Sequence, residues 1–117
     1  MYIHNEESRP WGHFITLFAQ EPGYKIKRIE VLPGKRLSLQ CHNRRSEHWV
    51  VVSGTGVVEV DQIKKEVGCG QYLFIDTRCK HRIECTSLRP LVFIEIQIGD
   101  YLGEDDIERF EDLYGRV

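Results

Sequence analysis

Hydrophobic and polar residues alternate along most of this chain, and the alternating stretches are separated by glycine, proline and other turn-forming residues. Alternation with a period of two is typical of β-strands that bury one face. The pattern predicts strands at residues 24–32, 36–42, 47–53, 57–60, 63–67, 71–75, 81–85 and 91–98. So many short strands in a chain of this length favour an all-β barrel or jelly roll.

The turns between these strands suggest how some of them pair. A proline–glycine turn separates 24–32 from 36–42, so we expect the two to form a hairpin. Two glycines close together follow 47–53, and 57–60 is expected to pair back on that strand.

The two ends of the chain differ from the rest. Residues 1–12 are mostly polar and are expected to form an extended arm. Near the other end, Asp105 or Asp106 can cap a helix. Three apolar residues recur there at helical spacing: Ile107, Phe110 and Tyr114. We therefore expect a short helix within 104–116 that covers an edge or mouth of the barrel.

Size and charge narrow the class of protein. A chain of 117 residues and 13.7 kDa is expected to form one domain, spanning 1–117. A net charge of -2 gives no overall attraction to nucleic acid or to anionic membranes. The polar start and the lack of any apolar run of about 18 residues argue against secretion and membrane spanning, so we expect a cytoplasmic protein. The four cysteines contain no CxxC pair and are expected to be reduced thiols.

Four side chains with metal-ligating atoms are spaced so that they can converge. Gln40 and His42 leave one strand on the same face, Glu47 follows a turn, and His81 comes from a distant strand. Two imidazole nitrogens and two hard oxygens suit one divalent ion of Zn, Mn, Co, Fe or Ni. The sequence therefore predicts a metal site inside the barrel.

Two motifs surround these residues. The spacings G(x)5QxH(x)4E(x)6G from Gly34 and G(x)10H from Gly70 resemble the two motifs of the cupin family. Longer stretches are similar to type II phosphomannose isomerases: RPWG at 9–12, YKIKRIEVLPGKRLSLQ at 24–40, RSEHWVVVSGTG at 45–56 and GDYLGEDDIERFEDLYGR at 99–116.

This resemblance implies a cupin jelly-roll barrel that interconverts mannose 6-phosphate and fructose 6-phosphate with a divalent metal. In the family this cupin is commonly the C-terminal part of a bifunctional mannose-1-phosphate guanylyltransferase and mannose-6-phosphate isomerase. The nucleotidyltransferase part has no counterpart in these 117 residues. We therefore expect a free-standing isomerase domain without GDP-mannose synthesis.

Arginines are the first candidates for binding the substrate phosphate, because a guanidinium can donate two parallel hydrogen bonds to it. The resemblance places Arg45, Arg109 and Arg116 at functional positions, and a spacing of seven would put the last two on one helical face. Arg36 shares the alternation of Gln40 and is expected near the barrel lumen.

The general base is less well defined by the sequence. The resemblance favours His48, but alternation places His48 on the opposite face from Glu47, where a surface histidine is the simpler interpretation. Lys27, Glu95 and a metal-bound hydroxide remain open candidates.

Two other functions are compatible with these residues. Arg78 and Cys85 depart from the usual second cupin motif, and a cupin that binds a phosphosugar or sugar nucleotide without reacting it is one alternative. An iron-dependent oxygenase is the other, although Gln40 in place of a histidine disfavours it. We also expect a homodimer, in which the arm before Trp11 pairs with the edge strand of a second subunit.

Overall fold

The computed structural model describes residues 2–111 and contains eleven β-strands. The strands are β1 (Tyr2–Arg9), β2 (Gly12–Gln20), β3 (Gly23–Val31), β4 (Leu39–Cys41), β5 (Arg45–Ser53), β6 (Thr55–Val60), β7 (Ile63–Gly68), β8 (Tyr72–Ile75), β9 (His81–Cys85), β10 (Leu91–Gly99) and β11 (Glu108–Glu111).

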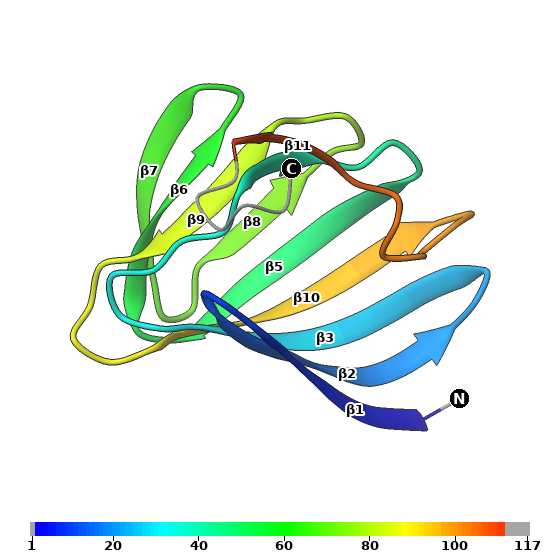
Figure 1. The fold of residues 1–117 in the computed structure, drawn as a ribbon, viewed down its shortest axis with the longest axis horizontal. Helices are drawn as coiled ribbons and strands as arrows, with labels where there is room; N and C mark the ends of the chain where they lie inside the picture. The colour runs from blue at the N-terminus through cyan, green and yellow to red at the C-terminus, as the bar shows by residue number, and fades with distance from the viewer. Residues whose placement is uncertain (1, 112–117) are drawn as a thin grey trace.

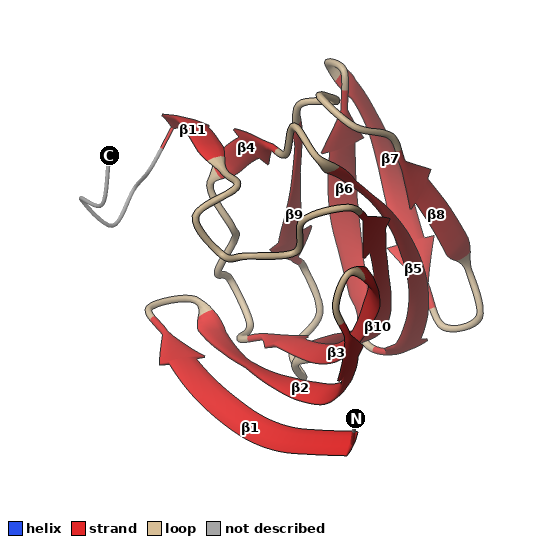
Figure 2. Ribbon diagram, turned by 90° about the vertical axis from the view of Figure 1, so that its right-hand side faces the viewer, coloured by secondary structure: helices blue, strands red, loops and turns tan. Residues whose placement is uncertain are grey.

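The strands form two antiparallel sheets that face each other (Figures 1 and 2). The six-stranded sheet has the order β1-β2-β3-β10-β5-β8, and the five-stranded sheet has the order β11-β4-β9-β6-β7. This all-β arrangement confirms the predicted fold class, and each strand expected from the alternation has a counterpart.

The two predicted strand pairings are wrong. Strand β3 pairs with β2 and β10, whereas β4 pairs with β9 and β11 in the other sheet. Strand β6 likewise pairs with β7 and β9 rather than with β5. Gly54 makes the crossing after β5 possible, because its φ of 78° is unfavourable for other residues and a Cβ there would meet the backbone of Pro90.

The predicted C-terminal helix is also wrong within the described residues, which contain no helix. Strand β11 occupies part of 104–116 and pairs with β4. A helix this short is marginal in water, while the free edge of β4 offers backbone partners to an extended segment. Tyr114 and the rest of 112–116 lie outside the described residues. With no helix in 2–111, none of these residues forms a helical membrane span.

The N-terminal arm forms strand β1, which pairs with β2 of the same chain. Strand β2 was not predicted from the sequence. The alternation of β2 is interrupted by a register shift between Thr16 and Phe18, so its sequence pattern was weak. Strand β1 lies at the edge of the six-stranded sheet.

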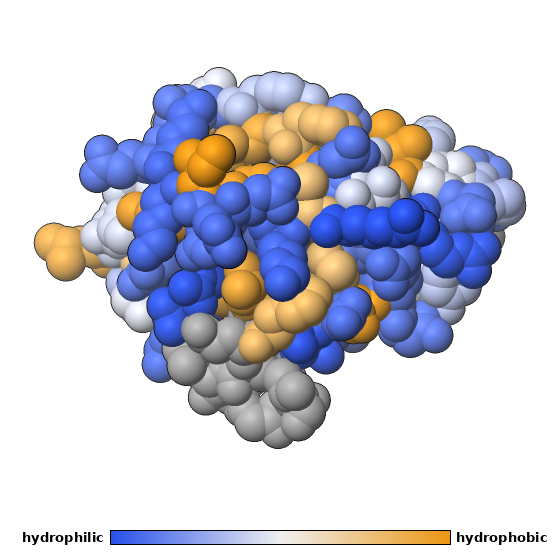
Figure 3. Space-filling model, turned by 90° about the horizontal axis from the view of Figure 1, so that it is seen from above, coloured by the Kyte–Doolittle hydropathy of each residue, from blue (hydrophilic) through white to orange (hydrophobic). Residues whose placement is uncertain are grey.

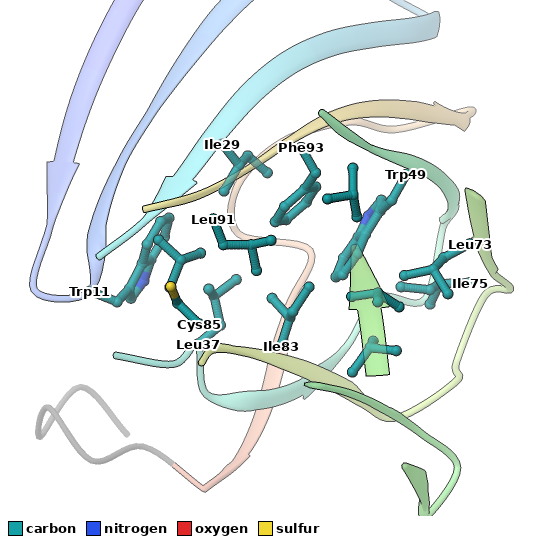
Figure 4. Packing of buried hydrophobic residues seen from close by; sticks show 14 of the residues in the cluster. Trp11, Ile29, Leu37, Trp49, Leu73, Ile75, Ile83, Cys85, Leu91 and Phe93 are labelled. Atoms are coloured by element: carbon teal, nitrogen blue, oxygen red, sulfur yellow. The ribbon is translucent and has the colours of Figure 1, made fainter. Parts of the chain in front are cut away.

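A hydrophobic core fills one half of the space between the sheets (Figure 4). Trp49 stacks on Phe93 with ring centroids 4.4 Å apart, and Trp11 lies at the other end of the cluster. Hydrophilic and hydrophobic residues are interspersed on the surface seen in Figure 3, which views the molecule of Figure 1 from above. The four cysteines are all unpaired, as expected.

The inner face of the six-stranded sheet changes from apolar to polar along its strands. One row of register partners, across β3, β10 and β5, is apolar: Ile29, Phe93 and Val51. Further along the same three strands the inner rows are Lys27, Glu95 and Trp49, and then Lys25, Gln97 and Glu47. The apolar half builds the core, and the polar half faces a cavity.

Candidate metal centre

The cavity lies between the polar half of the six-stranded sheet and the start of the other sheet. Its volume is about 110 Å³, which is room for several water molecules. Its polar lining combines the predicted ligands with further polar and charged groups: Arg9, Lys27, Ser38, Gln40, His42, Arg45, Glu47, His81, Glu95, Gln97, Glu104 and Arg109.

Three buried side chains in this cavity can hold one metal ion. His42, Glu47 and His81 each offer a ligand atom, and these atoms lie within 4.8 Å of one another. The carboxylate of Glu47 sits between the rings, with Oε2 3.3 Å from His42 Nε2 and Oε1 3.9 Å from His81 Nε2. Strands β5 and β9 and the end of β4 bring these side chains together from both sheets.

Both histidines are oriented so that Nε2 faces the cavity. His42 Nδ1 donates a hydrogen bond to the carbonyl oxygen of Asp106 at 2.7 Å, and His81 Nδ1 donates to the carbonyl of Cys79 at 2.9 Å. These bonds favour the tautomer in which Nε2 carries a free lone pair. Burial lowers the pKa of His42 to about 4, against the pull of the Glu47 carboxylate, so His42 is neutral near pH 7. The three residues therefore fit a divalent ion.

Gln40 lies on the cavity wall beside this cluster. It is buried in β4, opposite His81 in β9 and opposite Arg109 in β11. Its amide oxygen can supply a fourth, neutral ligand.

Glu47 is ionised and heavily hydrogen-bonded. Burial alone would raise the pKa of Glu47, but Arg45, His81 and His42 lower it to about 2. Oε2 accepts a hydrogen bond from Arg45 Nε at 2.9 Å and forms an ion pair with Arg45 Nη2 at 2.8 Å. Oε1 accepts one from Trp49 Nε1 at 3.0 Å. Glu47 therefore keeps its negative charge in a buried place, as a metal ligand must.

A second carboxylate, Glu95, lies on the neighbouring strand. Burial and the charge of Glu47 raise the pKa of Glu95 to about 8, although Arg45 and Lys27 oppose the shift. Gln97 Nε2 donates a hydrogen bond to Glu95 Oε1 at 2.6 Å. Gln97 is fully buried, and its Oε1 has no hydrogen-bond partner among residues 2–111. The cavity therefore holds Glu95 as an acidic group that can carry a proton, and Gln97 Oε1 as an acceptor for a hydroxyl group.

Comparison with known proteins assigns the family. Residues 1–112 match the family model described as "Mannose-6-phosphate isomerase C-terminal". The chain belongs to this family. The resemblance to phosphomannose isomerases is thereby confirmed.

Curated relatives in the family are longer proteins. The chain is 45% identical to the mannose-1-phosphate guanylyltransferase ManC of Salmonella typhimurium, over 99% of this chain and 24% of ManC. It is 46% identical to the alginate biosynthesis protein AlgA of Pseudomonas aeruginosa, over 97% of this chain and 24% of AlgA. The chain thus spans about a quarter of the length of these relatives.

Solved structures confirm the cupin fold. The capsular polysaccharide assembling protein CapF of Staphylococcus aureus superposes with a TM-score of 0.81 at 19% identity, over 96% of this chain and 35% of CapF. The cupin domain of Schizosaccharomyces pombe Cnp3 superposes with a TM-score of 0.73 at 14% identity, over 75% of this chain and 64% of that domain. At these identities the likeness concerns the fold alone.

Several sequence-predicted residues of this isomerase-family domain lie in the cavity. Arg45 contacts Glu47 directly, and Arg109 lines the wall from β11, a strand rather than the expected helix. Lys27 and Glu95, the open base candidates, also line the cavity. Their positions make them available to a ligand, and their roles remain predictions.

Two other candidates do not line the cavity. His48 lies on the outer face of β5, where its Nδ1 is 2.5 Å from the hydroxyl of Tyr72, because strand alternation turns it away from Glu47. Arg36 forms an isolated backbone β-bridge with Glu84 and borders a separate small pocket. The alternation of β4 does not apply to it, because regular strand geometry in β4 begins only after Arg36. Arg116 lies outside the described residues.

Arg78, the departure from the second cupin motif, is exposed and does not line the cavity.

Sequence reasoning missed three residues that complete the site. Trp49 was not among the candidates, although it shares the alternation of Glu47 and donates a hydrogen bond to that carboxylate. Gln97 shares the alternation of Glu95, a signal that could have found it. Asp106 was expected to cap a helix, and instead its carboxylate accepts the backbone N–H groups of Asn43 and Arg44 at 3.0 Å each.

Proposed function

We propose that this domain is a metal-dependent aldose–ketose isomerase that interconverts mannose 6-phosphate and fructose 6-phosphate. The observation that carries the proposal is the buried His42, Glu47 and His81 cluster beside a second acidic side chain, Glu95, that is not one of these three candidate ligands. Membership of the isomerase family supports it. The longer relative ManC is named as a guanylyltransferase, so the isomerase activity of this domain needs its own test.

His42, Glu47 and His81 would hold the ion, with Gln40 as a fourth ligand. A bound divalent ion supplies a Lewis acid that polarises the carbonyl and hydroxyl oxygens of the sugar. Arg45 keeps Glu47 ionised and fixed in orientation through the hydrogen bond and the ion pair described above.

The isomerisation also needs a group that moves a proton between the second and first carbons of the sugar. Glu95 is the best-placed candidate, because it lies in the cavity, is buried, and is oriented by Gln97. His48 on the outer face cannot reach the same space. Lys27 is held in an ion pair with Glu104 at 2.5 Å and is better suited to binding than to proton transfer.

The test is an assay coupling fructose 6-phosphate formation to a dye-linked readout, run on protein loaded in turn with Zn, Mn, Co, Fe and Ni. We expect turnover with at least one ion, loss of turnover with chelator, and loss in His42→Ala and His81→Ala. His48→Ala is the matched control, because it removes an imidazole one residue from Glu47 but outside the cavity. Metal-loaded protein without turnover of mannose 6-phosphate would contradict the proposal.

One observation favours a second candidate, a cupin that binds a phosphosugar without reacting it. Arg45 Nη2 lies 3.3 Å from His42 Nε2, so an internal cation already contacts two of the candidate ligands. Saturable, metal-dependent binding of mannose 6-phosphate without product would identify such a binding module. The iron-oxygenase alternative stays a prediction, and oxygen consumption by the iron-loaded protein tests it.

A further inference from the structure

Lys27 is a buried cation whose charge is balanced by a carboxylate that can leave. Its side chain is 4% exposed, and its Nζ lies 2.5 Å from Oε2 of Glu104 and 4.1 Å from the ring centroid of Phe14. Glu104 comes from the loop between β10 and β11, and its side chain is 47% exposed. A buried ammonium needs an anionic partner, but that partner need not be Glu104.

A second ammonium lies beside the same carboxylate. Lys25 Nζ is 4.0 Å from Glu104 Oε2, 2.9 Å from the carbonyl of Leu102 and 3.6 Å from Glu21. Two lysines on one face of β3 thus converge on one carboxylate oxygen. A phosphate group carries more negative charge and more acceptor oxygens than a carboxylate, so it would satisfy both ammonium groups better.

The separation between the two lysines and the candidate metal ligands suits the length of a hexose 6-phosphate. Lys25 is in register with Gln97, and Gln97 is in register with Glu47, so two strand spacings, about 10 Å, separate the backbones of Lys25 and Glu47. In a hexose 6-phosphate the phosphate is attached at the end of the carbon chain opposite the reacting carbons. A sugar bound between these sites would pass Glu95 and Gln97.

The loop that carries Glu104 is anchored independently at Asp106. The carboxylate of Asp106 accepts hydrogen bonds from two backbone N–H groups, and its carbonyl accepts one from His42. Glu104 can therefore leave Lys27 while the segment that orients His42 stays in place.

We propose that Lys27, which lines the cavity, and Lys25, which lies beside it on the far side of Glu104, form a phosphate subsite, and that Glu104 is an internal anion which the phosphate of the substrate displaces. This inference rests on the proposed phosphosugar substrate and names a site for its charged end. It reassigns Lys27 from base candidate to phosphate ligand. The competing interpretation is that the Lys27–Glu104 pair only fastens the loop to the sheet.

Binding measurements separate the two interpretations. Isothermal titration of the metal-loaded full chain with mannose 6-phosphate, inorganic phosphate and mannose gives three dissociation constants for each variant. Removal of a competing internal anion should lower the Kd for both phosphate probes about tenfold in Glu104→Gln and leave mannose unchanged. An unchanged or higher Kd for mannose 6-phosphate in Glu104→Gln would overturn the proposal.

Two further variants control the experiment. Glu66→Gln removes one negative charge from an exposed position on β7, outside the cavity, and should leave every Kd unchanged. If it lowers the phosphate Kd as much as Glu104→Gln does, the effect is general charge and the proposal fails. The double variant Lys27→Met with Glu104→Gln removes both charges together and so leaves no buried unpaired ion. It should raise the Kd for mannose 6-phosphate at least tenfold relative to Glu104→Gln, and equal values would contradict the subsite.

The outcome is independent of turnover. A protein that binds phosphate more tightly in Glu104→Gln but makes no fructose 6-phosphate has the subsite without the isomerase activity. A protein that turns over mannose 6-phosphate with no Glu104 effect has the activity, and the proposed subsite is then wrong.

Discussion

Trp49 Nε1 donates a hydrogen bond to Glu47 Oε1 at 3.0 Å, so the largest fully buried side chain of the core also fixes a candidate metal ligand. The indole further stacks on Phe93 and meets the ring of His81 edge-on at 5.8 Å. The core and the candidate ligands Glu47 and His81 are therefore packed as one continuous unit. A change in the indole should affect both metal binding and stability.

Trp49→Phe keeps an aromatic ring in the core but removes the donor to Glu47. We expect the metal dissociation constant to rise about tenfold, because groups that orient a ligand typically contribute this much. Competition with a chelating dye measures it. Trp11→Phe is the control, since Trp11 lies at the opposite end of the core (Figure 4) and its indole, although it also borders the cavity, is not the donor to Glu47. If both variants weaken metal binding equally, the hydrogen bond to Glu47 has no special role.

Arg45 compensates the buried charge of Glu47 when no metal is bound. Arg45→Met should destabilise the metal-free protein by about 3–5 kcal/mol, because it leaves a buried carboxylate without its cation. Zinc should restore more stability to this variant than it adds to the wild-type protein, since the ion replaces the lost positive charge. Denaturant unfolding with chelator and with zinc measures both effects.

Arg82→Met is the matched control for that experiment. Arg82 pairs with Glu59 at 3.2 Å in a partly exposed position, so its loss should cost about 1 kcal/mol or less. Zinc should stabilise Arg82→Met only as much as wild type. Equal zinc responses in the two arginine variants would show that Arg45 does not balance the metal site.

Strand positions could be predicted from the sequence, but strand partners could not. Alternation is a property of each strand alone, and it located eight of the strands. Pairing depends on the path of the chain between sheets, which at Gly54 is set by one left-handed residue and its close approach to Pro90. Local turn signals favoured hairpins because they contain no information about the second sheet.

The convergence of the candidate ligands His42, Glu47 and His81 was predictable because their spacing is itself a motif, and alternation placed His48 outside the cavity correctly. The charged groups were harder to place, since each depends on contacts distant in sequence. Arg36 was misplaced because alternation was applied before β4 becomes regular. Asp106 accepts a hydrogen bond from His42, which is 64 residues away in sequence. The helical spacing of nearby apolar residues favoured a helix there, so this contact was not predicted.

Glu95 should make the metal-free protein less stable as the pH rises. Its pKa is raised from 4.5 to about 8 by burial and by Glu47, so the carboxyl is protonated in the fold at a pH where it ionises in the unfolded chain. Its contribution is complete below about pH 4.5 and is lost as the pH rises towards about 8. Glu95→Gln should therefore gain stability relative to wild type across this window, by on the order of a few kcal/mol.

Denaturant unfolding of both proteins with chelator, at intervals from pH 4 to 9, tests this expectation. Glu66→Gln, at the exposed position on β7, is the control and should run parallel to wild type. Parallel curves for Glu95→Gln and wild type would mean that Glu95 is ionised in the folded protein.

Asp106 positions His42 through its backbone and holds the loop through its side chain. Asp106→Ala removes the acceptor of the Asn43 and Arg44 N–H groups, which should cost about 1–3 kcal/mol of stability. Because the carbonyl of residue 106 then loses its fixed place opposite His42 Nδ1, the metal dissociation constant should rise about tenfold. Asp106→Asn keeps one acceptor oxygen and should fall between wild type and Asp106→Ala in both measurements. A loss of stability in Asp106→Ala without any change in metal affinity would mean that His42 keeps its orientation without the anchored loop.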